Sequence, residues 1–132
     1  MSNDPTPSVL VIDDDHESRE VIAELLKQKG HVVFVAADGI EGLEIARRRG
    51  VDVAVTDIVM PRRDGLETIQ ELRKDFPDVR ILALSGGVAG QGQQNYLTIA
   101  TALGADAVMS KPVDVPTFLD TVTELARRTR KR

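Results

Sequence analysis

The chain has 132 residues, of which 42% are hydrophobic, 29% charged and only 3% aromatic, and it contains no cysteine. This length suits one domain with a single core, and the lack of cysteine excludes disulfides, thiolate catalysis and zinc sites built on cysteine. The net charge of -4 gives no overall attraction to nucleic acid or to an anionic membrane, and so few aromatic residues argue against a surface that stacks bases. Because the sequence shows neither a signal peptide nor a membrane-spanning apolar run, we expect a cytoplasmic protein.

The hydrophobic pattern predicts a repeated alternation of strand and helix. Short apolar runs of strand length recur along the chain, and apolar residues at helical spacing follow them. The expected strands are residues 9–12, 31–36, 53–57, 79–84 and 107–109. The expected helices are residues 16–29, a segment between Asp38 and Gly50, a segment between Asp64 and Pro77, a segment around 96–103, and a last helix that Asp114 caps. This alternation with short connections predicts an α/β fold, a parallel sheet with helices on both faces.

The first two expected helices each carry a set of apolar residues at helical spacing. These are Val21, Ile22, Leu25 and Leu26 in the first helix, and Ile40, Leu43 and Ala46 in the second. We expect each set to form one apolar face toward the sheet. Residues 86–94 (GGVAGQGQQ) carry no such pattern, so this connection is the least well specified part of the chain.

Polar residues stand at the carboxyl ends of several expected strands. Asp13 and Asp14 follow the first strand, Asp57 ends the third, Ser85 follows the fourth and Lys111 comes after the fifth. Carboxyl ends of parallel strands meet at one edge of a sheet, so these side chains should converge. Carboxylates in contact repel by about 4 kcal/mol per pair in a surface-like dielectric and need a cation, and hard oxygen ligands suit Mg²⁺. A carboxylate is also a known nucleophile toward phosphate.

Four stretches of the sequence resemble the signature of response-regulator receiver domains. They are VLVIDDDHESR (residues 9–19), VAVTDIVMPRRDG (53–65), ILALSG (81–86) and SKP (110–112), and they follow the order of that family over almost the whole chain. The combined match is specific, whereas any one stretch alone would be weak. The resemblance implies a flavodoxin-like (βα)5 doubly wound parallel sheet with strand order 2-1-3-4-5.

The resemblance also implies a role for each polar residue at the strand ends. Asp57 would be the phosphoacceptor, and Ser85 and Lys111 would contact the phosphoryl group. The implied ligands of Mg²⁺ are Asp14 directly, Asp13 through water, the phosphoacceptor Asp57, and the backbone carbonyl of Val59. The expected donor of the phosphoryl group is a sensor histidine kinase or a histidine phosphotransfer protein.

The switch implied by the resemblance departs from the usual receiver pattern. Phosphorylation would draw Ser85 toward the phosphoryl group and alter the face formed by the fourth helix, fifth strand and fifth helix. Many receivers also turn an aromatic residue inward three positions before the lysine, but this chain has Val108 there. The stretch between Ser85 and Lys111 is longer than in chemotaxis-type single-domain regulators. We therefore expect a mobile loop over residues 86–96 and an output that differs from the aromatic switch.

Three other interpretations fit part of the sequence. Asp13 and Asp15 form the D-x-D of haloacid-dehalogenase-like phosphatases, but a phosphatase would leave the arrangement around Asp57 unexplained. A flavodoxin-like FMN carrier would share the fold, yet it needs a phosphate loop after the first strand and aromatic residues around the flavin. A degenerate receiver that only binds proteins would not need the complete set of phosphorylation residues. The prediction is therefore a phosphoacceptor with a regulatory role rather than an enzyme.

The expected layout is a disordered lead over residues 1–7, a receiver domain over 8–127 and a basic tail over 128–132. Because the chain ends shortly after the last expected helix, we predict a stand-alone regulator or phosphate shuttle without an effector domain. Such a protein would act on a downstream target protein through the face of the fourth helix, fifth strand and fifth helix. Binding to DNA or a membrane is not expected. The expected state is a monomer or a weak phosphorylation-dependent dimer.

Overall fold

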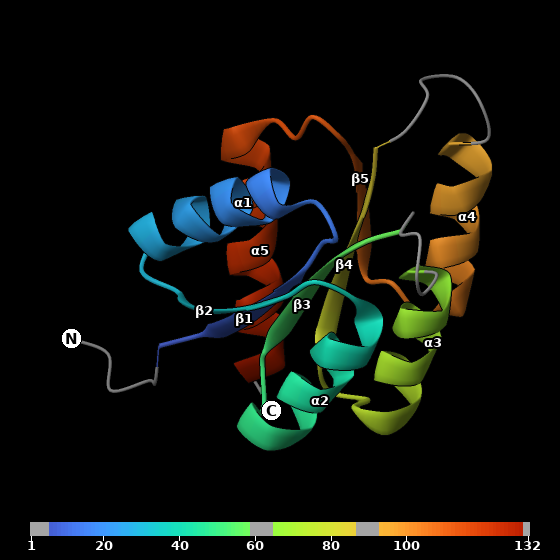
Figure 1. Cartoon of the computed structure of the whole chain (residues 1–132), viewed down its shortest axis with the longest axis horizontal. Coiled ribbons are helices and arrows are strands. Elements are labelled where there is room, and N and C mark those ends of the chain that lie inside the picture. Colours follow the sequence, from blue (N-terminus) through green and yellow to red (C-terminus); the bar gives the residue numbers. More distant parts are fainter. Residues whose placement is uncertain (1–5, 59–64, 87–92, 131–132) are drawn as a thin grey trace.

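Strands and helices alternate along the chain in the computed structural model, which describes residues 6–58, 65–86 and 93–130 (Figure 1). The strands are β1 (Ser8–Ile12), β2 (Val32–Ala36), β3 (Val53–Asp57), β4 (Arg80–Ser85) and β5 (Ala107–Ser110). The helices are α1 (His16–Gln28), α2 (Gly39–Arg49), α3 (Gly65–Asp75), α4 (Gln93–Leu103) and α5 (Val115–Arg130). The alternation predicted from the hydrophobic pattern is confirmed.

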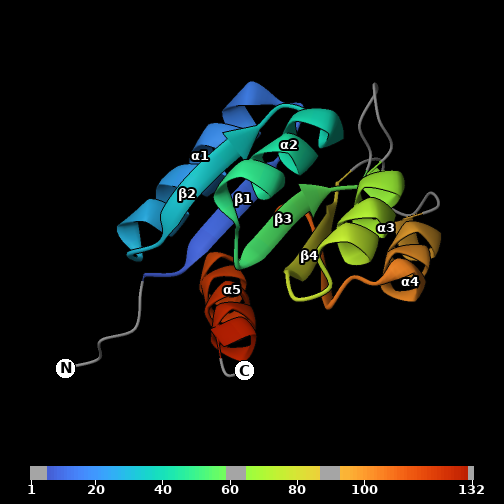
Figure 2. The ribbon, with the colours of Figure 1, turned by 90° about the horizontal axis from the view of Figure 1, so that it is seen from below.

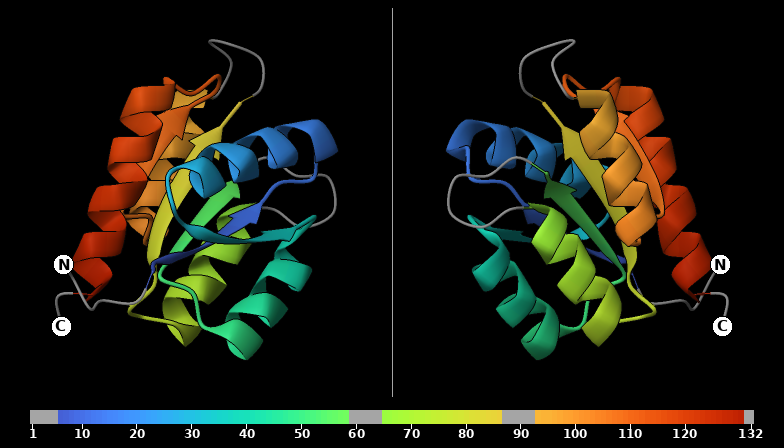
Figure 3. Two further views of the ribbon diagram at one scale, coloured as in Figure 1. Left: turned by 90° about the vertical axis from the view of Figure 1, so that its left-hand side faces the viewer. Right: turned by 90° about the vertical axis from the view of Figure 1, so that its right-hand side faces the viewer.

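All strands are parallel and form one sheet in the order β2-β1-β3-β4-β5. This is the predicted doubly wound, flavodoxin-like order. Helices α1 and α5 cover one face of the sheet, and α2, α3 and α4 cover the other (Figure 2 and Figure 3). Every residue of β3 is buried, which explains why its sequence is apolar almost throughout rather than alternating.

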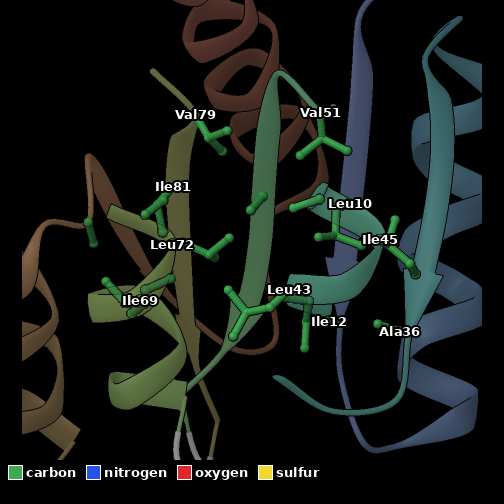
Figure 4. Packing of buried hydrophobic residues seen from close by; sticks show 14 of the residues in the cluster. Leu10, Ile12, Ala36, Leu43, Ile45, Val51, Ile69, Leu72, Val79 and Ile81 are labelled. Carbon is green, nitrogen blue, oxygen red and sulfur yellow. The ribbon is translucent and has the colours of Figure 1, made fainter. Parts of the chain in front are cut away.

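Side chains that alternate along the strands form a core on each face of the sheet. On the face of α2, α3 and α4, Leu10 and Ile12 pack in one cluster with Leu43 and Leu72 (Figure 4). The cluster on the face of α1 and α5 comprises Val9, Val11, Ile22, Leu26, Val53, Val55, Leu82, Leu84, Phe118, Val122, Leu125 and Ala126. Burying one such aliphatic side chain stabilises the fold by about 1.5–3 kcal/mol. The two clusters together hold the sheet, and with it the strand ends, against both helical layers.

Two of the apolar residues expected to face the sheet lie in solvent instead. Ile40 is 63% exposed and Val21 is 59% exposed, so the prediction of an inward orientation is wrong for both. In α2, Gly39, Leu43 and Ala46 are buried and follow one stripe at helical spacing. Ile40 is one residue from that stripe, a rotation of about 100° around the helix, and therefore points away from the sheet.

Some predictions concern segments outside the described residues. The expected cap at Asp64 and most of the expected mobile loop over residues 86–96 belong to these segments, although α4 is described from Gln93 onward. Within residues 6–58, 65–86 and 93–130, no helix is long and apolar enough to cross a membrane. The bounds given above for the N-terminal lead, the receiver domain and the basic C-terminal tail remain a prediction.

A charged network joins α3, β4 and the turn before β5 at the amino end of the sheet. Asp106 accepts a hydrogen bond from Arg73 Nη2 at 2.6 Å and one from the backbone N–H of Ile81 at 2.8 Å. Arg80 Nη1 lies 3.4 Å from the other oxygen of the carboxylate. Arg73 also donates to the carbonyl of Gly104 from both Nε and Nη2. The Asp106 side chain is only 13% exposed, and it is the shared partner of two arginines.

Asp106→Ala should lower the free energy of unfolding by about 2–4 kcal/mol, because it leaves two guanidinium groups and a backbone N–H without their shared acceptor. Urea denaturation followed by circular dichroism measures the loss. Glu44→Ala is the matched control, because Glu44 pairs with Arg48 at 3.9 Å with both side chains about two-thirds exposed. That exposed pair should contribute less than about 0.5 kcal/mol. Equal losses in the two variants would contradict the prediction.

His31, between α1 and β2, is a buried histidine without hydrogen bonds from its ring. It is 9% exposed, and neither ring nitrogen has a hydrogen-bond partner among the described residues. Burial, and to a smaller extent the charge of Lys29, lowers the pKa of His31 below its usual value. The folded state therefore keeps the imidazole neutral to a lower pH than the unfolded chain, in which histidine protonates near pH 6.5.

Since the pKa of His31 is lower in the folded state, protons bind preferentially to the unfolded chain as the pH falls below about 6.5. Stability should therefore decline between roughly pH 7 and the lowered pKa, and His31→Leu should reduce this decline and stabilise the protein by about 1 kcal/mol. Urea midpoints across this pH range measure both effects. His16→Leu is the control, because His16 is exposed. An unchanged pH slope in His31→Leu would refute the assignment.

Candidate functional site

The strand register brings the predicted site residues to one edge of the sheet. Asp57 is the last residue of β3, and Ser85, the last residue of β4, pairs with Ser110 at the end of β5. Asp13 comes directly after β1, and Lys111 comes directly after β5. The backbone N–H of Lys111 donates to the carbonyl of Ser85 at 2.9 Å, which continues the strand pairing into the site. The predicted convergence at the carboxyl edge is confirmed for these residues.

Three carboxylates form the centre of this edge. Oxygen atoms of Asp13, Asp14 and Asp57 all lie within 4.8 Å of one another. Asp13 and Asp57 are buried, whereas Asp14 is exposed. Each carboxylate pair repels by about 4 kcal/mol at this range in a surface-like dielectric. The group is therefore built to receive positive charge.

Lys111 supplies positive charge to this group. Its Nζ atom lies 2.9 Å from Asp13 Oδ2 and 3.5 Å from Asp57 Oδ2, and it donates to Ser18 Oγ at 3.2 Å. Burial lowers the pKa of the Lys111 ammonium, but the hydrogen bond to Asp13 and the charges of Asp57 and Asp13 outweigh it, so the pKa lies above its usual value. The lysine is thus a fixed cation directed at the carboxylates.

The backbone after β3 is held by close contacts that a side chain would prevent. Gly65 donates its N–H to the carbonyl of Ile58 at 2.8 Å, and the N–H of Ile58 donates to the carbonyl of Leu84 at 2.9 Å. A Cβ atom on Gly65 would lie 2.2 Å from the carbonyl oxygen of Asp57 and 2.6 Å from Ile58 Cα. Only glycine fits there, so the start of α3 can rest directly on the backbone that presents Asp57.

The remaining predicted site residues have different surroundings. Ser85 is 2% exposed at the end of β4. The residue after it, Gly86, lies directly beside the aliphatic stem of Lys111. Val108 is half-buried and packs against the core on the face of α2, α3 and α4. Val59, predicted to offer a backbone carbonyl to the metal, lies outside the described residues.

Sequence reasoning missed Ser18 as a site residue. Ser18 is on the first turn of α1, and its hydroxyl reaches the same ammonium as Asp13 and Asp57. The available signal was its position four residues after Asp14, one helical turn along α1 beside the acidic stretch. Asp15, by contrast, is exposed and caps α1 by accepting a hydrogen bond from the backbone N–H of Ser18. This capping role separates Asp15 from the three-carboxylate group and weakens the phosphatase interpretation.

An open apolar groove of about 540 Å³ runs from α1 to the segment after β5. Its lining includes Ser18, Val21, Leu25, Lys111 and Val115. The exposed side chain of Val21 therefore forms part of the wall of a groove that reaches Lys111.

Comparison with known proteins identifies the family. Residues 9–123 match the response regulator receiver domain family. The chain belongs to this family. The matched span contains the acidic group, Ser85 and Lys111, so the resemblance predicted from the sequence motifs is confirmed.

This receiver domain is similar both to longer and to single-domain regulators. It is 34% identical over 122 residues to the response regulator MprA of Mycobacterium leprae, covering 92% of this chain and 52% of MprA. It is 28% identical over 117 residues to the chemotaxis protein CheY of Halobacterium salinarum, covering 89% of this chain and 94% of CheY. A receiver-domain crystal structure from Clostridium thermocellum matches with a TM-score of 0.85 and 28% identity over 94% of this chain and 97% of that chain. The chain thus spans about half the length of MprA and most of this CheY.

The acidic group of this receiver domain fits a magnesium ion. The three side chains offer only carboxylate oxygens, and their proximity gives a charge that a divalent cation offsets. The donor set contains neither histidine nor cysteine, which a site for zinc would favour. Asp13, Asp14 and Asp57 are therefore the residues that would hold Mg²⁺.

Proposed function

We propose that this receiver domain accepts a phosphoryl group on Asp57 from a phosphohistidine in a Mg²⁺-dependent reaction. The observation that carries the proposal is the position of Asp57 at the tip of β3, within 4.8 Å of two further carboxylates and 3.5 Å from the Lys111 ammonium. A sensor histidine kinase or a histidine phosphotransfer protein is the proposed donor. The protein would work in the cytoplasm, as receiver domains typically do.

The proposed reaction is an in-line transfer. A carboxylate oxygen of Asp57 attacks the phosphorus, the new O–P bond forms as the P–N bond breaks, and the electron pair of the P–N bond stays on the donor nitrogen. The donor ring leaves as neutral imidazole if its other nitrogen carries a proton. Lys111 is placed to interact with the oxygens of the transferring group, because its ammonium is already hydrogen bonded beside Asp57. When bound, Mg²⁺ would offset negative charge on the carboxylates and the phosphoryl oxygens.

The product would carry roughly the extra negative charge of other phosphorylated side chains. We propose that Ser85 responds by hydrogen bonding to the phosphoryl group, which shifts the segment after β4 and biases the face formed by α4, β5 and α5. Val108 is half-buried against the core and has no aromatic ring to turn inward. The output of this receiver would therefore depend on backbone movement after Ser85 rather than on an aromatic rotamer.

The proposed partner for output is a downstream target protein that binds the α4, β5 and α5 face. We propose a stand-alone regulator or phosphate shuttle that binds neither DNA nor membrane, either monomeric or as a weak phosphorylation-dependent dimer. The similarity to CheY of Halobacterium salinarum covers 94% of that protein, and this supports the stand-alone part of the proposal. Light scattering with and without a phosphoryl mimic tests the oligomeric part of the proposal.

The test of phosphorylation is the intact mass of the wild-type protein after incubation with acetyl phosphate. With Mg²⁺ we expect a gain of one phosphate, and with EDTA in place of Mg²⁺ we expect none. A folded protein that gains no mass under either condition would favour a degenerate receiver that only binds proteins. Steady release of inorganic phosphate without an adduct would favour the phosphatase that uses Asp13 and Asp15.

A further inference from the structure

The Lys111 ammonium has three N–H groups, and three acceptors lie within reach among the residues that the structure describes. Two of the acceptors are the carboxylates of Asp13, at 2.9 Å, and Asp57, at 3.5 Å. The third is the hydroxyl of Ser18, at 3.2 Å, which comes from α1 rather than from a strand end. Ser18 is thus the uncharged acceptor, beside two carboxylates, of the Lys111 ammonium.

The backbone around Ser18 fixes the point from which its side chain leaves the helix. Its N–H donates to Asp15 Oδ2 at 3.0 Å, which is the N-cap bond of α1. The next residue, Arg19, donates its backbone N–H to the carbonyl of Asp15 and its Nη1 to the carbonyl of Asp13, at 2.9 and 2.8 Å. These bonds tie the first turn of α1 to the loop that carries the acidic residues. The start of the helix therefore fixes the Cα–Cβ bond of Ser18, and from this position the hydroxyl reaches Lys111.

The stem of Lys111 is confined from another side. A Cβ atom on Gly86 would lie 3.0 Å from Lys111 Cδ and 3.3 Å from its Cβ, so the stem runs directly over this glycine. The backbone of Lys111 is also paired with Ser85. The stem is guided by these contacts, but only the acceptors decide where the ammonium at its end is held.

The three acceptors differ in what a bound cation does to them. A divalent cation in the acidic group draws on the carboxylates of Asp13 and Asp57, which are the charged partners of Lys111. Hard cations of this kind favour carboxylate oxygens, so the Ser18 hydroxyl stays available to the ammonium. We propose that Ser18 is a positioning residue that keeps the Lys111 ammonium beside Asp57 once the cation and the phosphoryl group engage the carboxylates. This inference rests on the proposed phosphoacceptor function of the site.

The experiment compares wild type with Ser18→Ala and Ser18→Thr by NMR of the Lys111 side chain, assigned with Lys111→Arg. Without Mg²⁺ the two carboxylates still hold the ammonium, so the Cε and Hε signals of Lys111 should be alike in all three proteins. With saturating Mg²⁺ they should shift to values typical of a solvated lysine in Ser18→Ala only, because threonine keeps the hydroxyl. A merely structural role for Ser18 would change the signals in both conditions.

Phosphorylation by acetyl phosphate gives a second, independent readout. The rate with Ser18→Ala should fall roughly three- to tenfold, which corresponds to the loss of one hydrogen bond of ordinary net strength, and Ser18→Thr should restore most of it. Val21→Ala is the matched control, because Val21 lines the same groove one turn further along α1, is 59% exposed and has no side-chain atom that could accept a hydrogen bond.

The two readouts separate failure of this inference from failure of the proposed function. Lys111 signals in Ser18→Ala that match wild type with Mg²⁺ would overturn the role of Ser18, even if wild type is phosphorylated normally. An absence of phosphorylation in wild type would instead refute the phosphoacceptor function, while the Mg²⁺-dependent NMR comparison would still decide whether Ser18 holds the lysine.

Discussion

Asp57→Asn should lose the phosphate-sized mass gain completely while keeping the fold. Asparagine has nearly the same shape but presents a neutral amide, which is a far weaker nucleophile toward phosphorus than a carboxylate. The substitution also removes one of three crowded negative charges, so the metal-free protein should not lose more than about 1 kcal/mol of stability. Intact mass after treatment with acetyl phosphate and Mg²⁺ measures the first effect, and urea denaturation measures the second.

Asp14→Asn is the matched control for charge. It removes a neighbouring carboxylate within the same 4.8 Å group but leaves Asp57 and its contact with Lys111 in place. We expect it to require more Mg²⁺ for the same mass gain, whereas no concentration of Mg²⁺ should rescue Asp57→Asn. If Asp57→Asn still gained a phosphate and peptide mapping placed it in another part of the chain, the acceptor would be a residue other than Asp57.

The fold and most of the site could be predicted because both depend on order along the chain. The burial of β3 on both faces makes its apolar run visible, and parallel topology then forces strand ends to one edge. Asp13, Asp57 and Lys111 could be brought together on these grounds without any knowledge of their contacts. The resemblance to receiver domains added the roles of these residues.

The contacts that escaped prediction join residues far apart in sequence with no periodic signal. Ser18 and Lys111 are 93 positions apart, and Arg73 and Asp106 are 33 apart. Ser18, Arg73 and Asp106 each look like ordinary surface residues in the sequence until the packing of α1 and α3 is known. Ile40 failed for a different reason. Helical spacing indicates which residues could share a face, but Ile40 lies about 100° around the helix from the buried Gly39 and so falls outside the stripe that packs on the sheet.

Gly65→Ala should be severely destabilising, with a loss of about 3 kcal/mol or more in the free energy of unfolding. Its Cβ atom would lie 2.2 Å from the carbonyl oxygen of Asp57 and 2.6 Å from both Ile58 Cα and the Ile58 carbonyl oxygen. These are backbone atoms of the segment that leaves β3, so they cannot rotate away. The start of α3 must separate from this segment, and the hydrogen bond from Gly65 N–H to the Ile58 carbonyl is lost.

Gly42→Ala separates this effect from a general sensitivity to added volume. A Cβ atom there would lie 2.5 Å from Ile12 Cδ1 and 2.8 Å from Ile12 Cγ1, which is also closer than real Cβ contacts allow, but the neighbour is a side chain that can change rotamer. Alanine also favours the helix by up to about 1 kcal/mol over glycine, so the net loss should stay below about 2 kcal/mol. Midpoints of urea denaturation rank the stabilities of the two variants.

Phosphorylation is then measured without urea, at a temperature where both variants are folded. Only Gly65→Ala should slow phosphorylation, because only its clash displaces the backbone of Asp57. Equal phosphorylation rates in the two folded variants would show that the close approach of Gly65 supports the fold without positioning the phosphoacceptor.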